Sequence, residues 1–185
     1  MGELVLQTAR LELRQIDADD LEPHLEHLNT PTVMARLGGQ RPRAAILEKH
    51  EQSRAGFAAE GFGFMLAWER DSGALVGHCG LRRVANPLAP NCGDFEIGWL
   101  IREDRWRRGY AEEAMRAIID WAFTTHSAPY LVALTSGSNI GSWKLMEKLG
   151  MERRKEWDFD DPFFPPEDNP TIQYSLSREQ WSCNA

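Results

Sequence analysis

The sequence has few cysteines, no excess of positive charge and no long apolar run, and each absence excludes a class of protein. Its three cysteines, Cys79, Cys92 and Cys183, are widely spaced and lack the C-x-x-C or Cys/His spacing of a metal site. We therefore expect free thiols, no bound metal and a cytoplasmic location, where thiols stay reduced. The 28 acidic and 21 basic residues give a formal net charge of −7. This balance disfavours a nucleic-acid partner, because such binding normally needs a basic face.

The sequence also lacks the apolar segments that cross a membrane. No apolar run approaches the ~18 residues that span a bilayer, and MGELVLQTARLELRQ lacks the basic flank and apolar run of a signal peptide. We expect no membrane partner. The length of 185 residues fits one domain, residues 1–185. Such a chain buries roughly 70% of its unfolded surface and needs no disulfide or metal to fold.

Hydrophobic periodicity predicts a mixture of strands and helices. Alternating leucines in LVLQTARLELRQ predict one half-buried strand near the N-terminus. Helices are predicted after Asp17, at residues 43–59, from Gly109 and at residues 142–149, and further strands at residues 61–70, 73–84, 94–101, 130–135, 151–157 and 171–176. This mixture indicates an α+β or α/β architecture with a sheet of about seven strands.

The stretch DRWRRGYAEEAMRAI has three arginines, Arg105, Arg107 and Arg108, just before Gly109 and a predicted helix. The first turn of a helix has backbone N–H groups without partners and a partial positive charge of ~0.5, and glycine lets a phosphate approach the backbone. Arginine adds forked donors suited to phosphate. A plain turn whose arginines pair with neighbouring acids explains the pattern equally well. Neither the P-loop nor the dinucleotide-binding glycine pattern fits, which disfavours a nucleotide kinase or a dehydrogenase.

Two longer motifs in the right order carry a family resemblance. EIGWLIREDRWRRGYAEEA, followed by NIGSWKLMEKLGM, resembles the GNAT N-acetyltransferases, and more closely their RimJ/RimL-like branch. The segments TARLELRQIDADDLEPHLEHL and YSLSREQW are similar to the same branch, so the resemblance spans nearly the whole chain. It implies the GNAT acyl-CoA N-acyltransferase fold, α+β (α/β), with a mixed central sheet of about seven strands and about four helices.

The resemblance also implies an activity. The expected reaction is acetyl transfer from acetyl-CoA to a primary amine by direct attack, without a metal. The acceptor would be a protein or peptide N-terminal α-amine or a small cationic amine, and the protein a monomer or a homodimer. An α-amine, with a pKa of ~7.7–8.0, is more easily neutralised than lysine, with a pKa of ~10.4.

The residues that would hold acetyl-CoA follow from the same resemblance. The backbone of the strand ending in Leu100 and Ile101 would pair with the pantetheine arm, and Asn139 would contact the cofactor nearby. Asn139 is equally well explained as a helix N-cap. Arg107 stands where the family usually has the first glycine of G-x-G-x-A, so its backbone must adopt a conformation that a non-glycine residue tolerates. The pyrophosphate would be held by Arg107, Arg108, Gly109, Tyr110 and Ala111.

Two residues are candidates for proton transfer. Glu96 occupies the strand position where the family places a carboxylate, and it would accept a proton from the acceptor ammonium through water. An ordinary strand glutamate that faces solvent or pairs with an arginine is an equal alternative. Met146 stands where many members have a tyrosine acid, so Ser142 or a bound water would protonate the thiolate, which leaves readily because a thiol has a pKa of ~8.5.

Two further predictions concern the acceptor and the alternative function. The acidic, phenylalanine-containing loop at residues 158–168 is expected at the rim of the acceptor site, where its charge suits a cationic amine. His78, beside Cys79, is interpreted as a packing residue, because adjacent strand residues point to opposite faces. The absent tyrosine keeps open a non-catalytic acyl-CoA-binding or sensing domain on the same scaffold.

Overall fold

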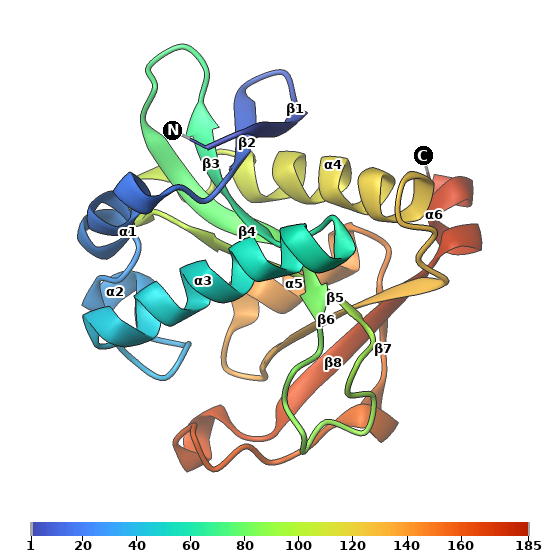
Figure 1. Cartoon of the computed structure of the whole chain (residues 1–185). Helices are drawn as coiled ribbons and strands as arrows, with labels where there is room; N and C mark the ends of the chain where they lie inside the picture. Colours follow the sequence, from blue (N-terminus) through green and yellow to red (C-terminus); the bar gives the residue numbers. More distant parts are fainter. Residues whose placement is uncertain (1, 185) are drawn as a thin grey trace.

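The computed structural model describes residues 2–184, in which eight strands form one mixed sheet (Figure 1). The strand order is β1-β2-β3-β4-β5-β6-β8-β7, and every neighbouring pair is antiparallel except β5 and β6, which are parallel. The strands are β1 Leu4–Gln7, β2 Leu11–Gln15, β3 Phe64–Glu69, β4 Leu75–Arg83, β5 Phe95–Ile101, β6 Tyr130–Ser136, β7 Glu152–Arg153 and β8 Thr171–Ser177. The mixed sheet predicted from the sequence is confirmed.

The strand count exceeds the predicted seven because the alternating N-terminal segment folds back on itself. The backbone N–H of Thr8 donates to the Leu11 carbonyl at 2.9 Å, and the resulting turn separates β1 from β2. The strand predicted over residues 151–157 is shorter than expected. It ends at Arg153, because Lys155–Trp157 turn into a 3-10 helix in which the Trp157 N–H donates to the Arg154 carbonyl.

Six α-helices accompany the sheet in the described chain, against about four predicted from periodicity. The two additional ones, α2 and α6, are short. The helices are α1 Leu21–His27, α2 Pro31–Met34, α3 Arg43–Glu60, α4 Tyr110–Thr124, α5 Ile140–Lys148 and α6 Arg178–Asn184. None of the helices in residues 2–184 combines the length and the apolar character needed to cross a bilayer.

The helices cover both faces of the sheet, and neighbouring residues of one strand pack on opposite sides. On β3, the buried side chain of Leu66 packs with Leu28, which follows α1, whereas its neighbours Met65 and Ala67 belong to the core that α4 covers. Figure 1 shows α3 crossing in front of the sheet. Helix α4 supplies the largest apolar contribution to the main core, through Ala114, Met115, Ile118, Ile119, Ala122 and Phe123.

Strands β5 and β6 diverge at the middle of the sheet. Each has seven residues, yet within the described chain their ladder consists of one pair, Glu96 opposite Val132. The opposite edge of β5 pairs with β4 over its whole length, from Phe95 to Ile101. The β6-facing edge of β5 beyond Glu96 therefore offers backbone groups that no neighbouring strand uses.

Candidate active site

The loop before α4 has the backbone conformation of an anion-binding turn. Arg107 and Gly109 both have positive φ, +58° and +81°, and the helix begins directly after Gly109. The Glu113 N–H donates to the Gly109 carbonyl at 3.0 Å, so the N–H groups of the three residues between them precede the helical hydrogen-bond ladder. These donors point out of the helix start, where the helix dipole favours an anion.

The three arginines before α4 fall into two groups. The Arg105 guanidinium lies 3.4 Å from Glu69 and 3.7 Å from Asp104, so for this residue the plain-turn interpretation holds. Arg107 and Arg108 are exposed, and in residues 2–184 neither guanidinium has an ion-pair partner. Two positive charges without an ion pair in the described chain therefore lie beside the first turn of α4, and that of Arg108 also acts on Glu69.

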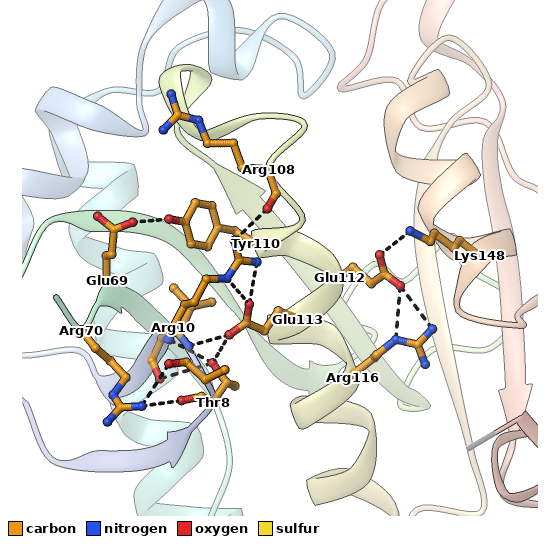
Figure 2. Close-up of polar contacts among 12 residues, drawn as sticks. Thr8, Arg10, Glu69, Arg70, Arg108, Tyr110, Glu112, Glu113, Arg116 and Lys148 are labelled. Atoms are coloured by element: carbon orange, nitrogen blue, oxygen red, sulfur yellow. Dashed lines mark hydrogen bonds and ion pairs between the residues drawn. The ribbon is translucent and has the colours of Figure 1, made fainter. Parts of the chain in front are cut away.

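A network of polar contacts fixes this loop to the turn between β1 and β2 (Figure 2). The Glu113 carboxylate accepts hydrogen bonds from the Thr8 hydroxyl at 2.6 Å, the Arg10 backbone N–H at 2.8 Å and the Arg10 Nε at 2.6 Å. Arg10 also donates from Nη1 to the Arg108 carbonyl at 2.9 Å, while the Arg108 side chain points away from the network. Burial raises the pKa of Glu113, but the bonds from Thr8 and Arg10 outweigh it and leave this pKa below its ordinary value.

Tyr110, predicted as a cofactor-binding residue, has its side chain committed to this network. The ring is buried, its hydroxyl donates to Glu69, and the Arg10 guanidinium lies 4.3 Å above the ring centre. The bond to Glu69, followed by burial, raises the pKa of Tyr110. Only the backbone of Tyr110 is therefore positioned to contact a ligand at the helix start.

The other side of α4 is joined to α5. Glu112 lies 2.5 Å from Lys148 Nζ and 3.2 Å from Arg116 Nη2 (Figure 2). At the start of α5, Asn139 occupies the N-cap position, but its side chain makes no capping hydrogen bond. Its carbonyl accepts from the Ser142 N–H at 3.1 Å. The half-buried Asn139 amide is thus placed near the helix start without a structural task of its own.

Leu100 and Ile101, the predicted pantetheine-binding residues, end strand β5. The Ile101 side chain belongs to the main core, and its carbonyl accepts a hydrogen bond from the Trp106 indole at 2.7 Å. Leu100 packs at the edge of the smaller core on the opposite face. Both residues lie on the stretch of β5 that has diverged from β6.

A cavity of about 850 Å³ opens beside this diverging edge. Glu96 and Leu100 from β5 and Ser142 from α5 line it together with the buried Met146. The predicted loop 158–168 contributes Phe159, Asp161, Phe163 and Phe164, which supports the predicted acceptor rim. The cavity thus gathers Glu96, Leu100 and Ser142, whereas Ile101, Asn139 and the predicted binding residues 107–111 lie outside its lining.

Glu96 faces the cavity as part of an ion pair with Arg82. The two residues are direct partners across β4 and β5, and both carboxylate oxygens accept bonds, at 2.9 Å from Nε and 2.7 Å from Nη2. Burial alone would lower the pKa of Arg82, but the Glu96 carboxylate more than offsets it and raises this pKa. The arginine-paired alternative for Glu96 is therefore realised, with the carboxylate held in the cavity.

Three buried histidines form a cluster, and two of them, His24 and His78, line the cavity. His24 Nδ1 lies 2.9 Å from His50 Nε2, and the His78 ring packs 5.0 Å from His24 and 4.9 Å from Phe64. Burial lowers the pKa of His24 to about 3 and of His50 to about 4, with neighbouring positive charges adding to it, and holds that of His78 well below its usual value. The packing role predicted for His78 fits these contacts, although its edge also lines the cavity.

Sequence reasoning missed three cavity residues, Arg82, Arg41 and Lys49. Arg82 is found only through strand register, which places it opposite Glu96. Arg41 and Lys49 lie before and on α3, and no local motif marks them. For Lys49 the helix predicted at residues 43–59 was the available signal, but it does not specify which face meets the cavity.

A family model described as an acetyltransferase (GNAT) domain matches residues 10–152 of this chain. The match covers both the helix-start loop and the cavity strands, and the chain therefore belongs to the GNAT acetyltransferase family. The mixed sheet with its flanking helices is the fold of that family.

Relatives and solved structures agree with this family. The uncharacterized N-acetyltransferase YnaD of Bacillus subtilis is 26% identical over 96% of this chain and 99% of its own length. The crystal structure of an acetyltransferase from Agrobacterium tumefaciens is 28% identical, covers 96% of both chains and has a TM-score of 0.77. A spermidine N-acetyltransferase from Vibrio cholerae, solved with CoA and spermine, has a TM-score of 0.73 over 94% of this chain and 99% of its own. At 14% identity, that last likeness concerns the fold alone.

Proposed function

We propose that this protein transfers an acetyl group from acetyl-CoA to a primary amine by direct attack. The observation that carries the proposal is the loop before α4, where Arg107 and Gly109 with positive φ present the first-turn N–H groups to an anion. The edge of β5 that diverges from β6 also supports the proposal, because this edge offers backbone groups to an extended amide-containing ligand.

The residues present fit acetyl-CoA. A phosphate at the helix start would accept from the N–H groups of Tyr110 and Ala111 and lie near Arg107 and Arg108, whose exposed guanidinium groups form no ion pair within residues 2–184. A Cβ atom added at Gly109 would lie 3.4 Å from Nη2 of Arg10, the arginine that bonds the Arg108 carbonyl. When bound, acetyl-CoA supplies the thioester whose acetyl group is transferred.

Within the cavity we assign Glu96 to the acceptor amine. Its carboxylate attracts the ammonium and takes up a proton through water, so that the amine attacks as a neutral nucleophile. Ser142 is the half-buried hydroxyl of the cavity that we assign to the departing thiolate, in place of the tyrosine that Met146 replaces. The RimJ/RimL-like branch and a peptide N-terminus or small amine as acceptor stay predictions.

Calorimetry with acetyl-CoA, followed by thiol release with a panel of amines, tests the proposal. We expect binding that raises the unfolding temperature and turnover with at least one class of amine. Absence of acetyl-CoA binding at millimolar concentration would contradict the proposal. Binding without turnover across the panel would instead favour the alternative, an acyl-CoA-binding or sensing domain.

A further inference from the structure

Charged side chains line the cavity unevenly. Two of its acids are neutralised by neighbouring arginines, since Arg82 bonds Glu96 and Arg83 Nε lies 2.9 Å from Glu60. The complete set comprises five cationic side chains, Arg36, Arg41, Lys49, Arg82 and Arg83, and three acidic ones, Glu60, Glu96 and Asp161. Removing the two neutralised pairs leaves three cations facing one acid.

The remaining acid, Asp161, accepts bonds from neutral donors and is also close enough to Arg41 to oppose the effect of burial on the Arg41 pKa. The Asp161 carboxylate accepts from Asn86 Nδ2 at 2.8 Å and from the Phe163 N–H at 2.9 Å. Arg36 lies 3.9 Å from Asp168, at the outer limit of an ion pair. Lys49 has no ion pair and no side-chain hydrogen bond with any residue in the range 2–184.

The environment of Lys49 is cationic. Desolvation lowers the pKa of Lys49, and the positive charges of Arg41 and Arg82 lower it further, whereas Glu96 opposes them. Lys49 is exposed to solvent and lines the same cavity as Arg41 and Arg82. An anion placed among them would offset this repulsion and gain charge-assisted hydrogen bonds.

Arg41 is held in place before any ligand arrives. Its Nη2 donates to the Leu37 carbonyl at 2.6 Å, and its guanidinium lies 3.9 Å above the Phe163 ring. Its Nε is a buried donor without a partner in the described chain. Because the guanidinium is already oriented, binding an anion here costs little side-chain entropy.

The cationic side chains of Lys49 and Arg41 are separate from the helix-start site. None of residues 105–111 lines the cavity, whereas Glu96, to which we assign the acceptor amine, does. The charge that complements Lys49 and Arg41 is therefore expected on the acceptor. We propose that the protein selects small amines that also carry a carboxylate, with Lys49 and Arg41 binding that carboxylate while Glu96 receives the amine. This inference rests on the proposed function, because it names the substrate class of the same site.

Matched acceptors test the selection directly. Pairs of amines that differ only in carrying a carboxylate or the corresponding carboxamide are compared by kcat/KM, corrected for the fraction of neutral amine. We expect the carboxylate member to be preferred by about tenfold or more, the size of one charge-assisted contact. Equal or better use of the carboxamide, or a preference for polyamines, would overturn the proposal.

The variant Lys49→Gln removes the charge while keeping most of the side-chain length. We expect a higher KM for the carboxylate acceptor by about tenfold, with little change in kcat and in the KM for acetyl-CoA, and no effect on the carboxamide. Lys155→Gln, at an exposed lysine outside the cavity lining, should leave kcat and the KM values for acetyl-CoA, the carboxylate acceptor and the carboxamide acceptor unchanged. A carboxylate preference that survives Lys49→Gln together with Arg41→Gln would exclude these residues as its source.

Binding of products separates this inference from the proposed function. N-acetylated carboxylates and carboxamides are titrated by calorimetry into protein saturated with CoA, which needs no turnover. Tighter binding of the carboxylate in the wild type but not in Lys49→Gln is expected, and equal binding of the two would overturn the inference. Loss of CoA binding itself would instead overturn the proposed function.

Discussion

Arg82 and Glu96 face each other as direct cross-strand partners, and both side chains line the cavity. The Arg82 side chain is 50% exposed, whereas that of Glu96 is 7% exposed. Solvent thus reaches the arginine, whereas the carboxylate that it binds is buried. The two hydrogen bonds from Arg82 orient the Glu96 carboxylate in the cavity, where we propose that it attracts the acceptor ammonium.

Replacing Glu96 tests its role as the base. We expect Glu96→Gln to lower kcat/KM about 100-fold at pH 7, the lower end of the range for loss of general-base catalysis, and by less at pH 9, where more of the amine is already neutral. The pH dependence of kcat/KM measures this. Asp94→Asn provides a matched control, since that carboxylate accepts from the Tyr130 hydroxyl at 2.6 Å and does not line the cavity. A loss of equal size at both pH values would contradict the role.

The position of Glu96 was predictable from the sequence, but its partner was not. Strand alternation identified which residues of β5 share a face, yet the register of β4 against β5 depends on contacts distant in the sequence. The same reason explains why the cavity cations on and before α3 were missed. Local signals placed the helix start at Gly109, because glycine, arginines and apolar periodicity all coincide there.

Arg107 provides a second prediction, from its positive φ of 58°. An L-residue in the left-handed region costs roughly 1–2 kcal/mol, whereas glycine adopts it freely but loses about 0.5–1 kcal/mol through backbone entropy. We expect Arg107→Gly to be neutral to slightly stabilising and to raise the unfolding temperature by up to ~4 °C. Thermal unfolding measures this.

Arg107→Ala is the matched comparison, because it removes the same charge and keeps the unfavourable φ. We expect both variants to weaken acetyl-CoA binding by a similar, small factor. We also expect Arg107→Gly to be more stable than Arg107→Ala. If alanine proves as stable as glycine, the loop does not hold this residue in the left-handed region.

The hydrogen bonds to Glu113 give a pH-dependent prediction. The pKa of Glu113 lies below the ordinary carboxyl value in the folded protein, so its stabilisation is present above that value and is lost as the pH falls through the folded pKa. We expect Glu113→Gln to destabilise the protein by about 1–2 kcal/mol at pH 7 and by progressively less below about pH 4.5. Urea unfolding at several pH values measures the difference.

The control for Glu113 is Glu103→Gln, at an exposed glutamate whose side chain makes no ion pair in residues 2–184. This variant should change stability by less than about 0.5 kcal/mol at every pH. Because Glu113 holds the β1–β2 turn against the loop, its replacement should also weaken acetyl-CoA binding, which calorimetry can measure. Unchanged stability and binding would show that the network in Figure 2 does not position the helix start.

The helix-start network also shows which parts of a site a sequence leaves out. The arginine-rich turn predicted an anion site, but Thr8 and Arg10, about one hundred residues away in sequence, fix its geometry. The fold brings the β1–β2 turn against α4, and nothing local to either segment encodes that contact. Similarly, the sequence did not show that the Tyr110 side chain bonds Glu69, which leaves the backbone of this residue for the predicted binding role.

The histidine cluster predicts how stability depends on pH on the acid side of neutrality. The pKa of His24 is lowered to about 3 and that of His50 to about 4, from an ordinary value of 6.5. As the pH falls below 6.5 the unfolded chain takes up protons that the folded cluster does not, so the free energy of unfolding decreases. Each histidine contributes a slope of up to about 1.4 kcal/mol per pH unit between 6.5 and its folded pKa.

We expect urea unfolding to show a steep loss of stability between pH 6.5 and 5. His50→Gln should reduce the number of protons taken up on unfolding by about one, and it should lower the stability at pH 7.5. His27→Gln, at a partly exposed histidine outside the cluster, should leave the slope unchanged. A wild-type slope near zero in this range would mean that the three rings accept protons without unfolding.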